Sequence, residues 1–322
     1  MPSLSFERGP EASPGKVGAP ERERGFVLII VIAVLGLLAL AAAGFAQVTR
    51  SQVKAAASTV GSSTAQGLAD AGVQLAVLDL VLGRQDPSYQ RRFAVGEKPF
   101  ACDAGDGRRL AVSIRDEAGK VDLNGAADRL LQALLVGVGA SKGLADAIID
   151  FRDDDNVKRP QGAERDDYSA AGRPGPKNAP FSAVEEIEQV LGVDAELAAR
   201  LRPHITVYTG QPGIDTTSAS RELLAILARG LDSEAGSTAS GQEDRSGDTD
   251  GPLPTMRFMG AQGRRFFAVH AEAYADSSAF VRDAILELGQ SRARPYTFLR
   301  WNRGVLRGGD AALEDGGLAP CP

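Results

Sequence analysis

The feature that most constrains this chain of 322 residues is an uninterrupted apolar segment near its N-terminus. The segment runs for 21 residues, from Phe26 to Ala46, and contains no charged side chain. At about 1.5 Å per residue, a helix of that length spans the roughly 30 Å hydrocarbon core of a bilayer. We therefore expect residues 26–46 to cross a membrane as a single helix.

Basic side chains flank this segment on both sides, and their balance sets the orientation of the chain. Arg22 and Arg24 precede the segment, while Arg50 and Lys54 follow it, so the nearest positive charges almost cancel. Two basic residues farther upstream favour an N-terminus on the cytoplasmic side. The globular part is then expected across the membrane.

Three interpretations of the segment compete. A cleaved secretory signal fits the basic flank, but the run exceeds the usual apolar core of about 7 to 15 residues. A plain membrane anchor fits its length equally well. In the third interpretation, Gly25 directly before Phe26 resembles the prepilin-peptidase site of type IV pilins and type II secretion pseudopilins. That interpretation predicts cleavage between Gly25 and Phe26.

The helical pattern continues beyond the apolar segment. Apolar residues recur there at spacings of three and four, which predicts an amphipathic helix that ends near Gly83 and Pro87. The stripe consists of Leu68, Ala71, Leu75, Leu78 and Leu82. A membrane helix that continues into an amphipathic half, packed on a globular head, is typical of pilins.

Two groups of strand-like segments are separated by a helical region. The strand-like segments are residues 91–95, 108–116, 264–276, 278–289 and 295–301. Four helices are expected between the groups, at residues 130–139, 142–152, 183–191 and 195–201. The order predicts an α+β protein with a helical module inserted into a strand-rich head, and residues 230–254 are expected to form a mobile loop.

Residues 135–152 resemble a helix-hairpin-helix, in which a Gly-x-Gly turn can present backbone N–H groups to a phosphate. A membrane-anchored DNA-binding protein is therefore an alternative function. Residues 125–205 nevertheless hold ten Lys and Arg against fourteen Asp and Glu, and the whole chain has a net charge of −6. Because DNA repels such a surface, the charge favours a packing role for the glycine turn and no nucleic-acid partner.

Acidic residues crowd into residues 150–167. Seven carboxylates lie in this segment: Asp150, Asp153, Asp154, Asp155, Glu164, Asp166 and Asp167. Carboxylates at close range repel one another, and a hard divalent cation with six to eight oxygen ligands relieves that cost. We expect Ca²⁺ there, bound by Asp150, Asp153, Asp155, Glu164 and Asp167.

The acidic segment has two alternatives to a simple calcium site. Asp153, Asp155 and Glu164 match positions 1, 3 and 12 of an EF-hand, but Val157 and Lys158 stand where a ligand and a glycine belong, so an EF-hand is excluded. The other alternative is a solvated acidic loop, partly neutralised by neighbouring Lys and Arg side chains.

Catalytic motifs are not evident. His204 and His270, the only histidines, have no neighbouring nucleophile motif, and neither a P-loop nor a dinucleotide-binding fingerprint occurs, so no enzyme activity is expected. Cys102 and Cys321 are the only cysteines. They either form a disulfide in an oxidising compartment or are two unrelated thiols.

Several stretches together resemble the type II secretion system minor pseudopilin K family. They are the junction RGFVLIIVIAVLGLLAL, DEAGKVDLN at 116–124, RPQGAERDDY at 159–168, PKNAPFSAVEEIEQVLGV at 176–193, RPHITVYTG at 202–210 and IDTTSASRELLAIL at 214–227. In the last stretch, Asp215 and Thr217 stand where the family usually shows Asn.

The resemblance implies a pilin-like fold with a long N-terminal transmembrane helix, an antiparallel sheet and a large inserted α-helical domain, with calcium bound by the head. The expected parts are a cleaved leader (1–25), the membrane helix (26–46), the first part of the head (47–124), the inserted domain (125–205) and the second part of the head (206–322).

The resemblance also implies a setting. The chain would be cleaved and methylated by prepilin peptidase and held in the inner membrane by one span, with a periplasmic head. Its partners would be the minor pseudopilins I and J, the major pseudopilin and the inner-membrane secretion platform.

The fifth residue after the expected cleavage site is Ile30, where most pilins and pseudopilins carry Glu. In that family the carboxylate of an incoming subunit meets the N-terminal amine of the subunit above. A subunit that lacks the carboxylate cannot make this pairing, which favours a position with nothing above it. The resemblance therefore implies the tip of the pseudopilus and a role in initiating its assembly.

Overall fold

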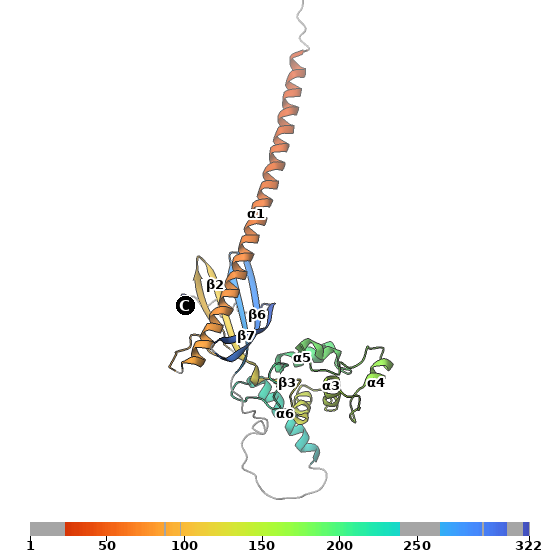
Figure 1. Ribbon diagram of the computed structural model, residues 1–322. Coiled ribbons are helices and arrows are strands. Elements are labelled where there is room, and N and C mark those ends of the chain that lie inside the picture. Colours follow the sequence, from red (N-terminus) through yellow and green to blue (C-terminus); the bar gives the residue numbers. More distant parts are fainter. Residues whose placement is uncertain are drawn as a thin grey trace, which may run out of the picture. The chain divides into compact units, whose positions relative to one another are not determined.

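The computed structural model describes residues 23–238 apart from 87 and 97, residues 265–307 apart from 292, and residues 318–321 (Figure 1). Most of the expected leader therefore lies outside the described residues, as does the part of the expected mobile loop after 238. Contacts divide the chain into two units, one ending at Thr59 and the other beginning at Val60. The boundary falls within the first helix.

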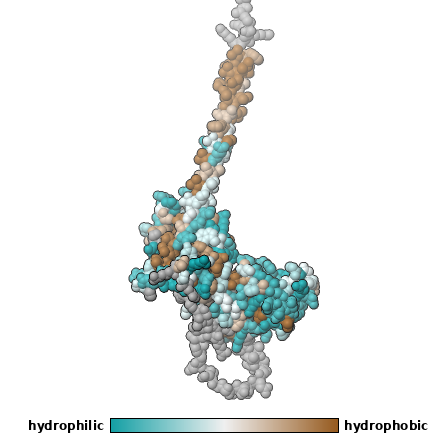
Figure 2. All heavy atoms as spheres, viewed as in Figure 1, coloured by the Kyte–Doolittle hydropathy of each residue, from teal (hydrophilic) through white to brown (hydrophobic). Residues whose placement is uncertain are grey.

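The first helix, α1, extends over Glu23–Gln85. Its segment from Phe26 is long and apolar enough to cross a membrane, and none of its most apolar window is buried. Figure 2 shows the apolar residues gathered on the N-terminal part of this helix. Because a bare apolar surface of that extent is unfavourable in water, the segment fits the expected single-pass membrane anchor.

An antiparallel sheet of five strands forms the head. Its spatial order is β1-β2-β5-β6-β7. The strands are β1 (Phe100–Gly105), β2 (Arg108–Asp116), β5 (Phe266–Ala275), β6 (Ser278–Ser291) and β7 (Arg294–Arg303). Strands β2 and β5 pair side by side although a long insertion separates them in sequence, so the predicted α+β fold is confirmed.

The strand expected at residues 91–95 does not form. In this segment Val95 makes only an isolated parallel bridge with Ile114. Its backbone is instead tied to α1, since the buried carboxylate of Asp79 accepts hydrogen bonds from the N–H groups of Arg92 and Phe93 at 2.9 and 3.2 Å. The first strand comes later, at β1.

The second half of α1 packs on one face of the sheet, and the predicted stripe contributes only in part: Leu68 and Leu75 are half-buried against the core. The fully buried helix face carries mostly small side chains, Ala65, Ala69, Val73, Ala76 and Val77, together with Leu80. Gly72 also lies on this face, where an added Cβ would come within 2.8 Å of Leu110 Cδ1. Close approach to the sheet therefore selects small residues, while Ala71 and Leu78 are exposed.

The insertion between β2 and β5 has its own apolar core and is longer than predicted. The expected limits were 125–205, but the core extends from Val121 to Leu231. Its helices are α2 (Asp128–Gly137), α3 (Leu144–Arg152), α4 (Arg165–Ala170), α5 (Ala195–Leu201) and α6 (Arg221–Thr238), with 3-10 helices η1 (Glu117–Gly119), η2 (Val184–Gln189) and η3 (Arg202–His204). The segment expected as a helix at 183–191 is the 3-10 helix η2.

Helix α6 accounts for most of the difference. It packs against α2 and continues through residues 230–238, which the sequence analysis assigned to a mobile loop. Leu231 is 7% exposed because it belongs to the apolar core. An added Cβ at Gly137, in the predicted glycine turn, would meet the backbone of Ile226 in α6. The glycine is thus a packing device.

The start of the insertion pairs with the segment that precedes α6 in a short parallel ladder of β3 (Val121–Asp122) and β4 (Ile205–Thr206). Asp122, the second residue of β3, is fully buried. One carboxylate oxygen accepts the N–H groups of Asn124 and Gly125, at 2.7 and 2.8 Å. The other accepts the N–H groups of Thr209 and Gly210 and the Thr209 hydroxyl, at 2.8 to 3.0 Å. One side chain therefore ties the start of the insertion to the segment that follows β4.

A disulfide joins Cys102 in β1 to Cys321, with the two Cα atoms 4.9 Å apart. The N–H of Asp103 donates to Ala319 O, and the N–H of Cys321 donates to Asp103 O, both at 2.9 Å. The C-terminal segment therefore lies along the edge strand of the sheet. Of the two alternatives that the sequence left open, the structure has the disulfide.

We predict that Cys321→Ser destabilises the head by about 2 to 4 kcal/mol, because the unfolded chain loses a long closed loop. The measurement is thermal melting of the full chain in detergent micelles, with the wild-type chain plus reductant as the matched control. Both samples should melt at the same lowered temperature. Alkylation of both cysteines in exported, unreduced protein would contradict the disulfide.

Candidate metal centre

The acidic loop of the insertion begins where α3 ends. Helix α3 stops at Arg152, whose guanidinium donates hydrogen bonds to the carbonyl oxygens of Leu123 and Ala126. These bonds anchor the end of α3 to the start of the insertion. Asp153 and Asp155 follow directly, and Glu164 stands just before α4. A short loop thus brings carboxylates from two ends of the same segment together.

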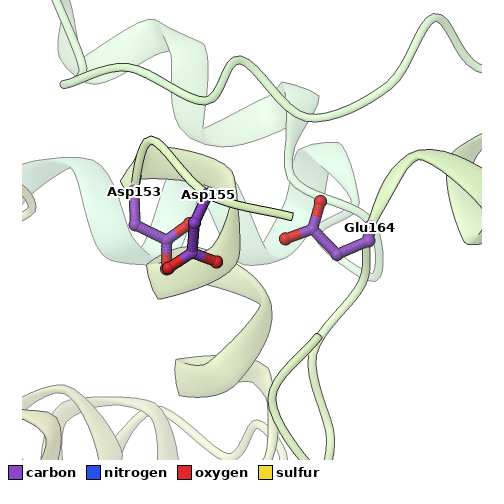
Figure 3. A group of neighbouring side chains, drawn as sticks. All are labelled: Asp153, Asp155 and Glu164. Carbon is purple, nitrogen blue, oxygen red and sulfur yellow. The ribbon is translucent and has the colours of Figure 1, made fainter. Parts of the chain in front are cut away.

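Asp153, Asp155 and Glu164 form one cluster. Each offers a carboxylate oxygen, and these oxygens all lie within 4.8 Å of one another. Figure 3 shows the first two carboxylates side by side, with the carboxylate of Glu164 pointing toward them from the opposite strand of the loop. Since Ca²⁺ holds its oxygen ligands at about 2.3 to 2.6 Å, two ligands of one ion stand up to roughly 5 Å apart. The spacing fits a single ion.

Unpartnered oxygens distinguish this cluster from a set of ion pairs. Asp153 Oδ1 and both carboxylate oxygens of Glu164 are buried without a well-formed hydrogen bond from the described residues, although the Glu164 carboxylate faces the backbone N–H groups that begin α4. Asp155 is exposed, and its Oδ1 accepts the N–H of Val157 at 2.7 Å. Buried carboxylate oxygens without donors are costly, so this donor set fits a divalent cation that prefers oxygen.

Asp150 lies beside the cluster but outside it. Its side chain is fully buried, its Oδ2 accepts the N–H of Arg159 at 3.2 Å, and its Oδ1 has no described donor. An added Cβ at Gly162 would collide with this carboxylate, so the loop needs a glycine there. Asp150 therefore adds negative charge behind the three clustered ligands.

The electrostatics of the ion-free cluster favour protonation. Burial raises the pKa values of Asp150, Asp153 and Glu164 above their ordinary ranges, and repulsion from a neighbouring carboxylate raises each further. Acids with raised pKa values stabilise the fold at low pH, and that contribution is lost as the pH rises through the raised values. A bound cation would remove the repulsion at neutral pH.

Asp167 has a different role from the predicted one. Its Oδ1 pairs with Lys158 Nζ at 2.6 Å, and its Oδ2 accepts the N–H of Glu164 at 2.9 Å. The hydrogen bond from Lys158 lowers the pKa of Asp167. These two contacts occupy its oxygens, so Asp167 positions Glu164 and is not one of the clustered ligands.

Asn178, which the sequence did not mark as part of the site, holds the loop from the other side. Its side-chain amide donates to Asp155 O at 2.8 Å and to Asn156 Oδ1 at 3.1 Å, while its Oδ1 is buried with no described donor. Its φ of 48° lies in the left-handed region, where Asn is tolerated. The only sequence signal was its place in the stretch PKNAPF.

Comparisons with known proteins agree with this architecture. Residues 110–210 match the family model of the type II secretion system (T2SS), protein K. No curated protein matches the chain. A chain in the crystal structure titled the GspK-GspI-GspJ complex, from the type 2 secretion system of enterotoxigenic Escherichia coli, is similar in fold. The two are 18% identical with a TM-score of 0.52, and the match covers 80% of this chain and 99% of that one.

We predict that Ca²⁺ raises the melting temperature of the full chain and that a chelator lowers it, because an ion bound only to the folded state stabilises that state. At about 100 times the Kd, the gain is roughly 2.7 kcal/mol. Asp153→Asn and Asp155→Asn should each weaken the response. Asp154→Asn is the matched control, since Asp154 is exposed and outside the cluster. Melting indifferent to both calcium and chelator would contradict the site.

Proposed function

We infer that this chain, which belongs through residues 110–210 to the type II secretion system protein K family, serves as a minor pseudopilin. The observation that carries this function is the combination of the matched region with its setting. The matched region covers β2, the closing ladder and most of the insertion. It is connected to a sheet that packs against the second half of α1. The first half of α1 is long and apolar enough to span a membrane.

The partners are proposed to be the minor pseudopilins of the I and J types, with the major pseudopilin below them. The similar structure was crystallised as a complex of three such proteins. In this chain Leu78 of α1 supports an assembly role, because its side chain is 49% exposed although it follows the membrane segment. An exposed apolar side chain on a helix outside the membrane is suited to contact another subunit.

The tip is the proposed position of this subunit. Ile30 replaces the carboxylate that other subunits use to pair with the amine of the subunit above, and in α1 its side chain is 45% exposed. A chain without that carboxylate gains nothing from a subunit above it. The amine of its own processed N-terminus, at Phe26, is still free to pair with the carboxylate of the next subunit below.

The proposed location is the inner membrane, with the head in the periplasm. The Cys102–Cys321 disulfide supports a periplasmic head, because such bonds persist in oxidising compartments. Calcium is proposed to stiffen the acidic loop. Prepilin peptidase and the inner-membrane platform are the remaining proposed partners.

We predict that the mature chain begins at Phe26, as read by N-terminal mass spectrometry of membrane protein from cells that contain the peptidase. Gly25→Ile should leave full-length protein, because the cleavage site needs a small residue, and should abolish secretion. Gly36→Leu is the matched control, since an added Cβ there meets nothing within 4 Å. A mature chain that begins near Gln47 would support a signal peptide instead.

We predict that detergent-solubilised chain forms a 1:1:1 complex with full-length partners of the I and J types, measured by native mass spectrometry. In cells, Ile30→Glu should reduce the number of pseudopili several-fold, because a carboxylate with no amine above it is costly in the membrane. Ile30→Leu should have no effect. Many copies of the chain crosslinked along the shaft, or normal initiation without it, would contradict the tip position.

A further inference from the structure

A polar cleft lies on the sheet face that α1 does not cover. Side chains alternate between the two faces of a strand, so Leu110, Val112 and Ile114 of β2 pack toward α1 while Ser113 and Arg115 point to the other face. Residues of the insertion, from η1, η2 and the segment around β4, form the opposite wall. The cleft encloses about 490 Å³.

Cationic side chains outnumber acidic ones in the lining of this cleft. The cations are Arg115, Lys120, Arg202, Arg300 and Arg307. The acids are Glu117, Glu185 and Asp283, and each already has a partner within the structure. Lys120 and Thr206 contact Glu117 at 2.5 and 2.6 Å, Arg300 contacts Glu185 at 2.9 Å, and His270 contacts Asp283 at 2.6 Å.

Arg115 is the exception among these cations. It makes no ion pair or hydrogen bond through its side chain with the residues that the structure describes, and its Nε is buried without an acceptor. It also lines a smaller adjoining pocket together with Lys120. A guanidinium offers five donors in a planar fork, which matches an oxyanion. A half-buried guanidinium without an acceptor among the described residues points to a ligand that supplies one.

The cleft is wider than one oxyanion needs. Its walls also include the apolar side chains of Val184, Ile205 and Ile285 and the ring of Tyr208. Pockets of about 300 to 1,000 Å³ hold ligands with both apolar and polar parts. A polypeptide segment with a carboxylate between apolar side chains offers both a polar and an apolar part, whereas a free inorganic anion offers only the polar part.

We propose that this cleft binds an acidic segment of another polypeptide, and that a carboxylate of that segment pairs with the guanidinium of Arg115. The pairing consists of two parallel charge-assisted hydrogen bonds, in which two N–H donors of the guanidinium face the two carboxylate oxygens. The proposal does not depend on the proposed function, because it rests on Arg115 and the walls of its cleft alone.

The test uses the full chain in detergent micelles and a fluorescein-labelled, end-blocked heptapeptide of sequence SLESLES, followed by fluorescence anisotropy. The peptide SLQSLQS, which lacks the carboxylates, is the control ligand and should bind about tenfold more weakly, since roughly 1.4 kcal/mol corresponds to that factor. Equal affinity of the two peptides, or no binding of SLESLES at about 1 mM, would overturn the proposal.

The matched variants are Arg115→Gln and Arg108→Gln. Arg108 lies on the same strand, pairs with Asp106 at 2.6 Å and does not line the cleft. We expect Arg115→Gln to weaken SLESLES binding about tenfold and Arg108→Gln to leave it within roughly twofold, at unchanged melting temperature. Arg115→Lys should fall between the two, because Lys keeps the charge but loses the fork. Equal binding by wild type and Arg115→Gln would exclude this cleft.

A competition arm distinguishes the source of the oxyanion. Sodium phosphate, compared with sodium chloride at equal ionic strength, should not displace SLESLES beyond the common effect of salt. Full displacement by phosphate at about 1 mM would assign the cleft to a free anion and overturn the polypeptide ligand.

Discussion

The arrangement of the insertion depends on one buried carboxylate, that of Asp122. It is fully buried, and its two oxygens accept hydrogen bonds from residues that follow β3 and from residues that follow β4. Asn124, two residues on, bonds the backbone of Phe181 in both directions and also donates to Val207 O. Because buried donors and acceptors are costly to leave without a hydrogen bond, these bonds hold three segments that are distant in sequence in a fixed arrangement.

The hydrogen bonds of Asp122 and Asn124 also position the candidate metal centre. Arg152, the last residue of α3, donates to the carbonyls of Leu123 and Ala126, which flank the Asn124 turn. Asp153 is the next residue, so the hydrogen bonds of Arg152 fix where the acidic loop begins. Asn178 fixes the loop from the other side through Asp155 O, and Phe181 stacks on Phe151 with ring centroids 4.9 Å apart. Because Arg152 and Asn178 anchor the loop on either side of the acids, the protein itself holds the carboxylates close together.

Local patterns in the sequence predicted much of the fold, and long-range contacts account for what they missed. The apolar run, four of the five strands of the sheet and the grouping of Asp153, Asp155 and Glu164 follow from residue types and spacing. The buried face of α1 could not be read in this way, because leucine spacing does not reveal that Gly72 must approach Leu110 closely. Nor could α6 be assigned to the insertion, since its apolar face has meaning only against α2. The role of Asp167 could not be predicted from spacing, because only the folded loop brings Lys158 Nζ to its carboxylate.

Asp122 and Glu164 show why the same chemistry leads to two different roles. Both carboxylates are buried. The oxygens of Asp122 are supplied with N–H and O–H donors by the turns around them, so the charge is satisfied by the protein and its role is structural. The oxygens of Glu164 face only the backbone N–H groups that begin α4, make no well-formed hydrogen bond with the described residues, and lie beside two further carboxylates. The number of hydrogen-bond donors around a buried carboxylate, rather than its burial or the density of acids, therefore separates one that holds the fold together from one that is suited to a cation.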